Sequence, residues 1–129
     1  MTEINYNAIG RKVAALYPEL VKEMMVSPAL EDINLIPEIF SNHFKDPSDS
    51  EKRMVFIGVI LSLYDPDVLA GWKPTLKYGI RTQIAKIYSV GETVISHNLQ
   101  TVRNYYLIYK KYKSQVDTIT NQIKEEYEK

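Results

Sequence analysis

Hydrophobic positions recur at helical spacing along nearly the whole chain. Residues 5–17 form one such amphipathic segment, which stops before Pro18, and Pro18 can open the next helix. Residues 37–44 read as a further short helix that begins with a proline. No segment has a clear strand periodicity, so the sequence predicts an all-α helical bundle.

The longest apolar run is MVFIGVILSLY, residues 54–64. Ser48 and Glu51 precede this run at the spacing of a capping box, so we expect a buried helix over residues 49–64. The run is far shorter than the roughly 20 residues that a membrane-spanning helix needs. The next helix is expected over residues 75–88, after a loop in which Trp72 would plug the core.

The C-terminal part contains neither glycine nor proline after Glu92 and predicts a long amphipathic helix. Its aromatic and aliphatic positions alternate at spacings of three and four residues, which is the spacing of a heptad seam. Two interpretations remain open: the seam pairs with a second copy, or it lies on its own domain. The residues that would mediate self-association are Tyr105, Tyr109, Tyr112, Val116, Ile119 and Ile123, within an oligomerisation helix over 105–129.

Charge is segregated along the chain, although the net charge is zero. Residues 73–113 contain eight basic side chains and one acidic side chain, a net charge of +7. Residues 1–72 carry a net charge of −5, which indicates an acidic N-terminal helical bundle. Local charge of one sign governs attraction to a polyanion, so the basic window suits nucleic acid.

Within this window, the stretch IAKIYSVGETVISHNL joins two helical patterns through a very short turn. Ile84 and Ala85 would face Ile95 and Leu99, and Val90 would fill the turn between the helices. A small side chain such as alanine is needed where two short helices cross closely.

This pattern resembles the helix-turn-helix superfamily of sigma factors and small repressors, and the resemblance covers residues 81–104. It departs from the family at Ser89, where glycine is usual, and at Gly91, where serine is frequent. Ser89 must therefore adopt a turn conformation that glycine enters more easily.

The resemblance implies a DNA-binding unit over residues 73–104, within one compact domain overall. The second helix would enter the major groove and contact base edges through Glu92, Thr93, Ser96, His97 and Gln100. Phosphates would be held by Lys77, Arg81, Thr82, Lys86 and Arg103.

Other chemistry has little support in the sequence. His43 and His97 are the only histidines and there is no cysteine, so we expect no metal site and no cofactor. No nucleophile elbow or phosphate-binding glycine loop is present, so we expect no enzyme. The N-terminus lacks the apolar stretch of a signal peptide, and we expect a protein of the bacterial cytoplasm, in a host or phage-infected cell.

The sequence therefore favours an oligomeric, non-enzymatic transcriptional regulator that binds double-stranded DNA and no membrane. Two alternatives remain open. Small terminase subunits of tailed phages are similar in being short, helical and oligomeric with a helix-turn-helix, although that unit often comes first in their chains. The other alternative is a helical adaptor that binds a protein and no nucleic acid.

Overall fold

The computed structural model describes residues 28–71, 73 and 75–127, and these form helices with irregular connections and no strand. The order is a short 3-10 helix η1 (Ile33–Leu35), then α3 (Ile36–His43), α4 (Ser50–Tyr64), α5 (Pro66–Leu69), α6 (Ile80–Tyr88), α7 (Glu92–Ile108) and α8 (Lys110–Tyr127). The prediction of an all-α bundle is confirmed. The predicted helix over residues 5–17, the segment after Pro18 and Trp72 lie outside the described residues.

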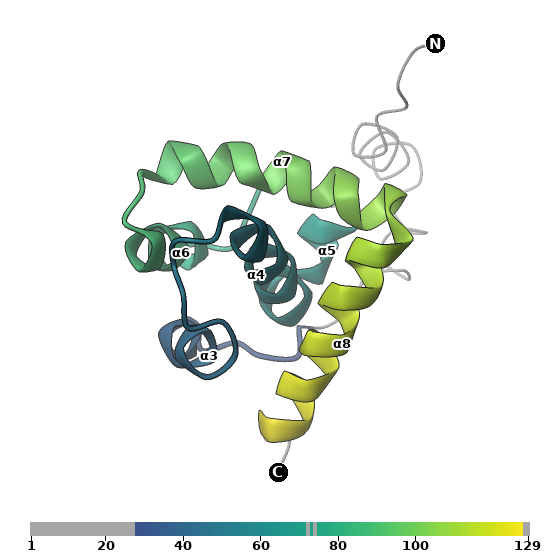
Figure 1. Cartoon of the computed structure of the whole chain (residues 1–129), viewed down its shortest axis with the longest axis horizontal. Helices are drawn as coiled ribbons and strands as arrows, with labels where there is room; N and C mark the ends of the chain where they lie inside the picture. The colour runs from purple at the N-terminus through teal and green to yellow at the C-terminus, as the bar shows by residue number, and fades with distance from the viewer. Residues whose placement is uncertain (1–27, 72, 74, 128–129) are drawn as a thin grey trace.

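Helix α4 is the centre of the fold, with α3, α6, α7 and α8 arranged around it (Figure 1). Its side chains from Val55 to Leu61 are buried on every side of the helix, as are Leu63 and Tyr64. The prediction of a buried helix over 49–64 is thus confirmed, and the short helix predicted over 37–44 matches α3.

The cap of α4 differs from the predicted one. Asp49, not Ser48, precedes the helix, and its carboxylate accepts the backbone N–H groups of Glu51 and Lys52 at 3.0 and 3.2 Å. The Ser48 hydroxyl instead donates to the carboxylate of Asp46 at 2.6 Å. Aspartate is as good a cap as serine, and its negative charge also suits the positive end of the helix.

Helix α6 begins at Ile80, not at residue 75 as predicted. Gly79 has a φ of 91°, which is incompatible with a right-handed helix and separates residues 75–78 from α6. A Cβ at this position would also lie 2.5 Å from Cδ1 of Ile33. Glycine at position 79 therefore permits both the left-handed backbone conformation and the close approach of Ile33 in η1.

The predicted long C-terminal helix is divided at Tyr109, whose φ of −100° and ψ of 107° are extended. No glycine or proline causes this bend. The direction of the chain changes between α7 and α8 (Figure 1). Val102 of α7 and Val116 of α8 both reach the core, where each is fully buried. The bend therefore follows from packing around α4 and not from local backbone preference.

Gly58 lets α8 approach α4 closely. A Cβ at Gly58 would lie 2.7 Å from Oη of Tyr112 and 2.9 Å from Cγ2 of Val116. The Tyr112 hydroxyl also donates to the backbone carbonyl of Met54 at 2.6 Å. Two residues of the predicted seam, Val116 and Ile123, are fully buried within the protomer.

Candidate nucleic-acid interface

Helices α6 and α7 pack against each other through the residues that the motif places at their contact. Ile84 and Ile95 are fully buried, and Ala85 and Leu99 are nearly so. Val90, between the helices, is partly buried against the same core. The two helices are therefore held by a continuous apolar contact.

A three-residue turn of Ser89, Val90 and Gly91 connects these helices. Ser89 is left-handed, with φ of 53° and ψ of 44°, as the resemblance required of the residue in the usual glycine position. The backbone N–H of Ser89 donates to Lys86 and that of Val90 donates to Ala85, at 3.3 and 3.1 Å. Together these two bonds form a Schellman motif, which ends α6 and satisfies its last carbonyl groups.

The start of α7 is fixed on α6 by a hydrogen bond between side chains. The Thr82 hydroxyl donates to Oε1 of Glu92 at 2.9 Å. Gly91 precedes α7 with no side-chain cap, so Glu92 supplies the negative charge that its positive end favours. Thr82 and Glu92 are both exposed, but each already has the other as its partner.

The remaining candidate base-reading side chains lie on the outer side of α7. Thr93, His97 and Gln100 are exposed, and they follow one another at helical spacing along the surface. Ser96 is half-buried, and its hydroxyl donates to the backbone carbonyl of Glu92 at 3.1 Å. Thr93, His97 and Gln100 are thus the side chains best placed to meet a base edge.

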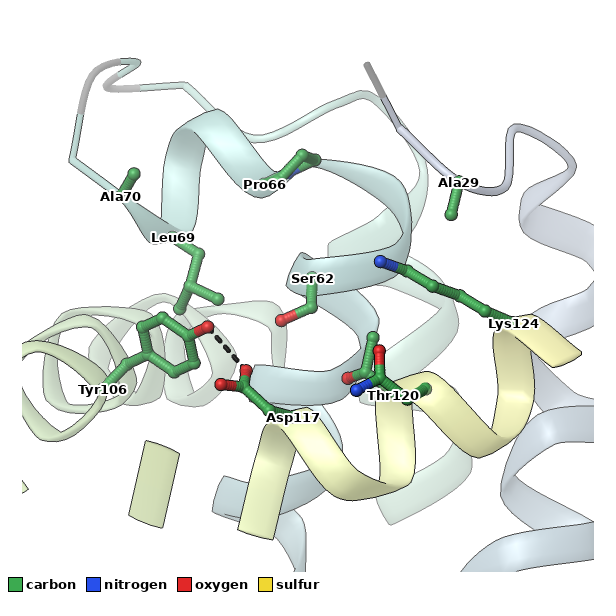
Figure 2. Close-up of a pocket in the computed structure, with 10 residues that line it drawn as sticks. Ala29, Ser62, Pro66, Leu69, Ala70, Tyr106, Asp117, Thr120 and Lys124 are labelled. Carbon is green, nitrogen blue, oxygen red and sulfur yellow. Dashed lines mark hydrogen bonds between the residues drawn. The ribbon is translucent and has the colours of Figure 1, made fainter. Parts of the chain in front are cut away.

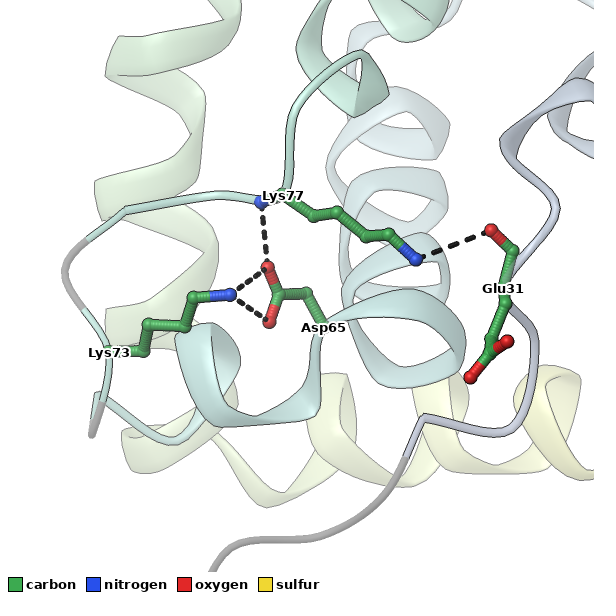
Figure 3. A network of polar contacts seen from close by, with 4 residues as sticks. All are labelled: Glu31, Asp65, Lys73 and Lys77. Atoms are coloured by element: carbon green, nitrogen blue, oxygen red, sulfur yellow. Dashed lines mark hydrogen bonds and ion pairs between the residues drawn. The ribbon is translucent and has the colours of Figure 1, made fainter.

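Lys73 and Lys77, by contrast, are engaged in a polar network before α6 (Figure 3). The buried carboxylate of Asp65 accepts hydrogen bonds from Nζ of Lys73 at 3.3 Å and from the backbone N–H of Lys77 at 2.8 Å. Nζ of Lys77 donates to the backbone carbonyl of Glu31 at 3.3 Å. In the structure Lys77 thus helps to hold the loop before α6, and its predicted phosphate contact stays a prediction.

The other predicted phosphate contacts are unequal in exposure. Lys86 is exposed on α6, whereas Arg81 and Arg103 are half-buried. Lys86 is accordingly the most accessible cation of the α6–α7 pair.

Sequence reasoning missed Arg53 of α4 as a basic residue beside the turn. Its guanidinium carbon lies 5.8 Å from the ring centroid of Tyr88, the last residue of α6. A cation over an aromatic face is attracted by the ring quadrupole. No local signal could have found this contact, because Arg53 and Tyr88 lie far apart in the sequence.

The basic residues of the window lie in the loop before α6, on α6, within α7 and at the start of α8. Lys110, Lys111 and Lys113 start α8, beyond the bend at Tyr109. A helix with the 17 residues of α7 is about 25 Å long. The net charge of +7 is therefore spread over the loop and all three helices.

A cavity of about 380 Å³ lies where α4 and α5 meet α7 and α8 (Figure 2). At its edge, the Tyr106 hydroxyl donates to the carboxylate of Asp117 at 2.6 Å, and Nζ of Lys113 lies 2.7 Å from the same carboxylate. Burial and this hydrogen bond raise the pKa of Tyr106. The contact joins α7 to α8 across the bend.

The predicted self-association residues differ in their surroundings. Tyr105 and Tyr109 are exposed, Tyr112 and Ile119 are half-buried, and Val116 and Ile123 are fully buried inside the protomer. Only the first four are accessible to a second copy.

The histidines lie in separate places. Nε2 of His43 is 3.0 Å from Oε2 of Glu126, while His97 is exposed on α7. In the part of the chain that the structure describes, no group of His, Cys, Asp and Glu could hold a metal ion. Among the same residues, no helix is both long and apolar enough to cross a membrane.

Comparisons with known proteins give no relative for this chain. No family model, no curated protein and no solved structure matches it.

Proposed function

We propose that this chain is a non-enzymatic helix-turn-helix protein that binds double-stranded DNA through α7 and regulates transcription. The observation that carries the proposal is the pairing of α6 and α7. A left-handed residue ends α6, a three-residue turn follows, and the small residue Ala85 lies in the buried contact. This pairing presents one polar side of α7 to solvent.

The exposed side of α7 has suitable chemistry for base recognition. Gln100 can form two hydrogen bonds with adenine, Thr93 can donate, accept or offer its methyl group to thymine, and His97 can donate or accept. Lys86 is exposed on α6, and Arg53 of α4 lies over the ring of Tyr88 at the end of α6, so both could contact phosphates without reading sequence. Reading and positioning are thereby divided between different side chains.

Binding to duplex DNA at several salt concentrations tests this proposal. If about five phosphates are neutralised, log K should fall against log salt with a slope near −4 to −5. Lys86→Gln should reduce the magnitude of that slope by about one. Lys45→Gln, an exposed lysine after α3, is the matched control and should leave the slope unchanged. Absence of binding at low salt would overturn the proposal.

A second candidate function is a helical adaptor that binds a partner protein. Exposed Tyr105, Leu107, Ile108 and Tyr109 near the α7–α8 bend favour it. The same DNA titration separates the two candidates, because an adaptor would show no salt-dependent affinity for duplex DNA. A ring of many copies in solution would instead favour the DNA-packaging role of a small terminase.

A further inference from the structure

Large hydrophobic side chains are exposed mainly at one place on the described surface. Tyr105, Leu107, Ile108 and Tyr109 are each between 38 and 55% exposed, and all four lie at the bend between α7 and α8. Single exposed hydrophobic residues are ordinary on a protein surface, whereas a cluster marks an interaction site.

Three tyrosines form the centre of this cluster. The Tyr105 ring meets Tyr109 at 5.2 Å and Tyr112 at 5.7 Å between centroids, both edge to face. Tyr112 is itself fixed to α4 through its hydrogen bond to Met54. Rigid tyrosine rings supply contact area at a low cost in conformational entropy, as in many protein interfaces.

Two shallow grooves, each of about 420 Å³, lie at this surface, and the first of them is lined by two of these rings. The first is lined by Ser50, Glu51, Met54, Val55, Tyr105, Tyr112 and Gln115. The second is lined by Lys111, Ser114, Gln115, Thr118 and Ile119. Gln115 lines both grooves, acidic Glu51 lines the first and basic Lys111 lines the second. We call Tyr109 and the two grooves the tyrosine face.

We propose that a second copy of this chain docks on the tyrosine face, about a twofold axis that passes beside Gln115. In such an interface, residues on opposite sides of the axis face each other in the two copies. Lys111 would then meet Glu51 of the partner subunit, and the same contact would recur on the other side of the axis. The tyrosine rings would be buried between the two ion pairs.

The charges favour a second copy over other occupants. Glu51 and Lys111 are both exposed, and within the described residues neither forms an ion pair. A nucleic acid would be attracted by Lys111 but repelled by Glu51, and an acidic peptide would meet the same conflict. Exposed Lys110 adds a second positive charge beside Lys111. A surface with an apolar centre, a carboxylate in one groove and lysine at the other is complementary to itself.

This proposal does not depend on DNA binding, and its test is made without DNA. Sedimentation velocity of the full chain over a range of concentrations should show a monomer–dimer equilibrium. Glu51→Lys places lysine opposite lysine twice, and Lys111→Glu places glutamate opposite glutamate twice. Each variant should raise the dimer Kd about tenfold, since exposed charge pairs are individually weak.

The decisive measurement is a mixture of these two variants. A Glu51→Lys copy facing a Lys111→Glu copy has opposite charges at both contacts, so the mixture should recover the wild-type dimer Kd. If Glu51 and Lys111 paired within one protomer, a chain carrying both substitutions would recover the wild-type dimer Kd, but the mixture of single variants would not. That result would overturn the proposal.

Matched controls change the same charges elsewhere on the surface. Glu31→Lys and Lys45→Glu, both at exposed positions outside the tyrosine face, should leave the dimer Kd unchanged. Tyr109→Ser should raise it about tenfold while the far-UV circular dichroism of the chain stays the same. A chain that stays monomeric at millimolar concentration, or variants that self-associate as the wild type does, would overturn the proposal.

Discussion

Val90 donates its backbone N–H to the carbonyl of Ala85 at 3.1 Å, and this bond turns the chain from α6 into α7. It is possible only because Ser89, between them, is left-handed. Ala85 and Val90 also contribute their side chains to the hydrophobic core that α6 and α7 share. Backbone and packing requirements of the helix pair therefore coincide within six residues of sequence.

Exchanging the residues at the two ends of the turn should stabilise the fold. Ser89→Gly relieves a left-handed conformation that costs a non-glycine residue about 1–2 kcal/mol, offset in part by the greater backbone entropy of glycine. Gly91→Ser adds the side-chain cap that α7 lacks and contributes a few tenths of a kcal/mol. Chemical denaturation should show a net gain of about 0.5–1 kcal/mol for the double variant. A loss of stability on Ser89→Gly would contradict the left-handed assignment.

Ala85→Leu should destabilise the protein more than the added apolar area suggests. Ala85 is only 5% exposed and belongs to the core that α6 and α7 share, so a larger side chain there would have to displace packed neighbours. Overpacking of this kind costs about 1–3 kcal/mol. The matched control is Lys86→Leu, which adds a similar side chain at the next, exposed position and should leave the denaturation midpoint nearly unchanged.

Gly58→Ala should also destabilise the fold, although alanine is the better helix former by about 1 kcal/mol. The new methyl group would displace Tyr112 and Val116 and lengthen the hydrogen bond from Tyr112 to Met54. We expect a net loss of about 1–3 kcal/mol in the free energy of unfolding. Gly91→Ala is the control, because a Cβ there meets nothing within 4 Å.

Sequence predicted the elements whose causes are local. The apolar run of α4 is longer than a helix with a single buried face would need, so the sequence directly predicted a helix that is buried on all sides. The pairing of Ile84 with Ile95 rested on a short-range pattern, and both side chains are indeed buried. The conformation of Ser89 could be anticipated because the turn has a fixed geometry.

Features that depend on distant residues were not predicted. The break before Ile80 follows from the contact between Gly79 and Ile33, and the bend at Tyr109 follows from packing on α4. The fold also places the backbone carbonyl of Glu31 beside the ammonium group of Lys77, and nothing in the sequence indicated this contact. A sum of charges along a window therefore overstates the cations that a ligand can reach.

Alkaline pH should unfold the protein through its buried tyrosines. Burial raises the pKa of Tyr64, Tyr88 and Tyr112 above their ordinary value of 10.0. The unfolded chain then loses these protons first, so the stability they contribute is intact below pH 10 and declines as the pH rises toward their folded values. Tyrosinate absorbance at 295 nm should increase together with the loss of helical circular dichroism.

The control for that titration is a variant with one buried hydroxyl fewer. Tyr88→Phe removes a buried hydroxyl that has no hydrogen-bond partner, and should shift alkaline unfolding to higher pH. Tyr78→Phe, at a position that is 96% exposed, should leave the transition in place. If the absorbance shows that all tyrosines have ionised while the circular dichroism shows that the helices remain folded, this prediction is contradicted.

Gln100 and Lys86 should differ in what they contribute to DNA binding. Gln100 lies on the exposed side of α7, outside the buried row of Ile95 and Leu99, whereas Lys86 is exposed on α6. Loss of a bidentate base contact costs about 1–3 kcal/mol of discrimination, while loss of a phosphate contact weakens all sequences alike. Gln100→Ala should therefore narrow the affinity gap between a selected site and random duplex. Lys86→Ala should lower both affinities by a similar factor.

Competition binding of a selected duplex against random duplex measures this difference. Gln122→Ala, an exposed glutamine on α8, serves as the matched control and should change neither affinity. If Lys86→Ala collapses the affinity ratio while Gln100→Ala preserves it, the two roles are reversed, and α6 instead of α7 reads the bases. If neither substitution changes binding to either duplex, this surface does not contact DNA. The exposed side chains at the α7–α8 bend then become the main interaction site, as the adaptor function requires.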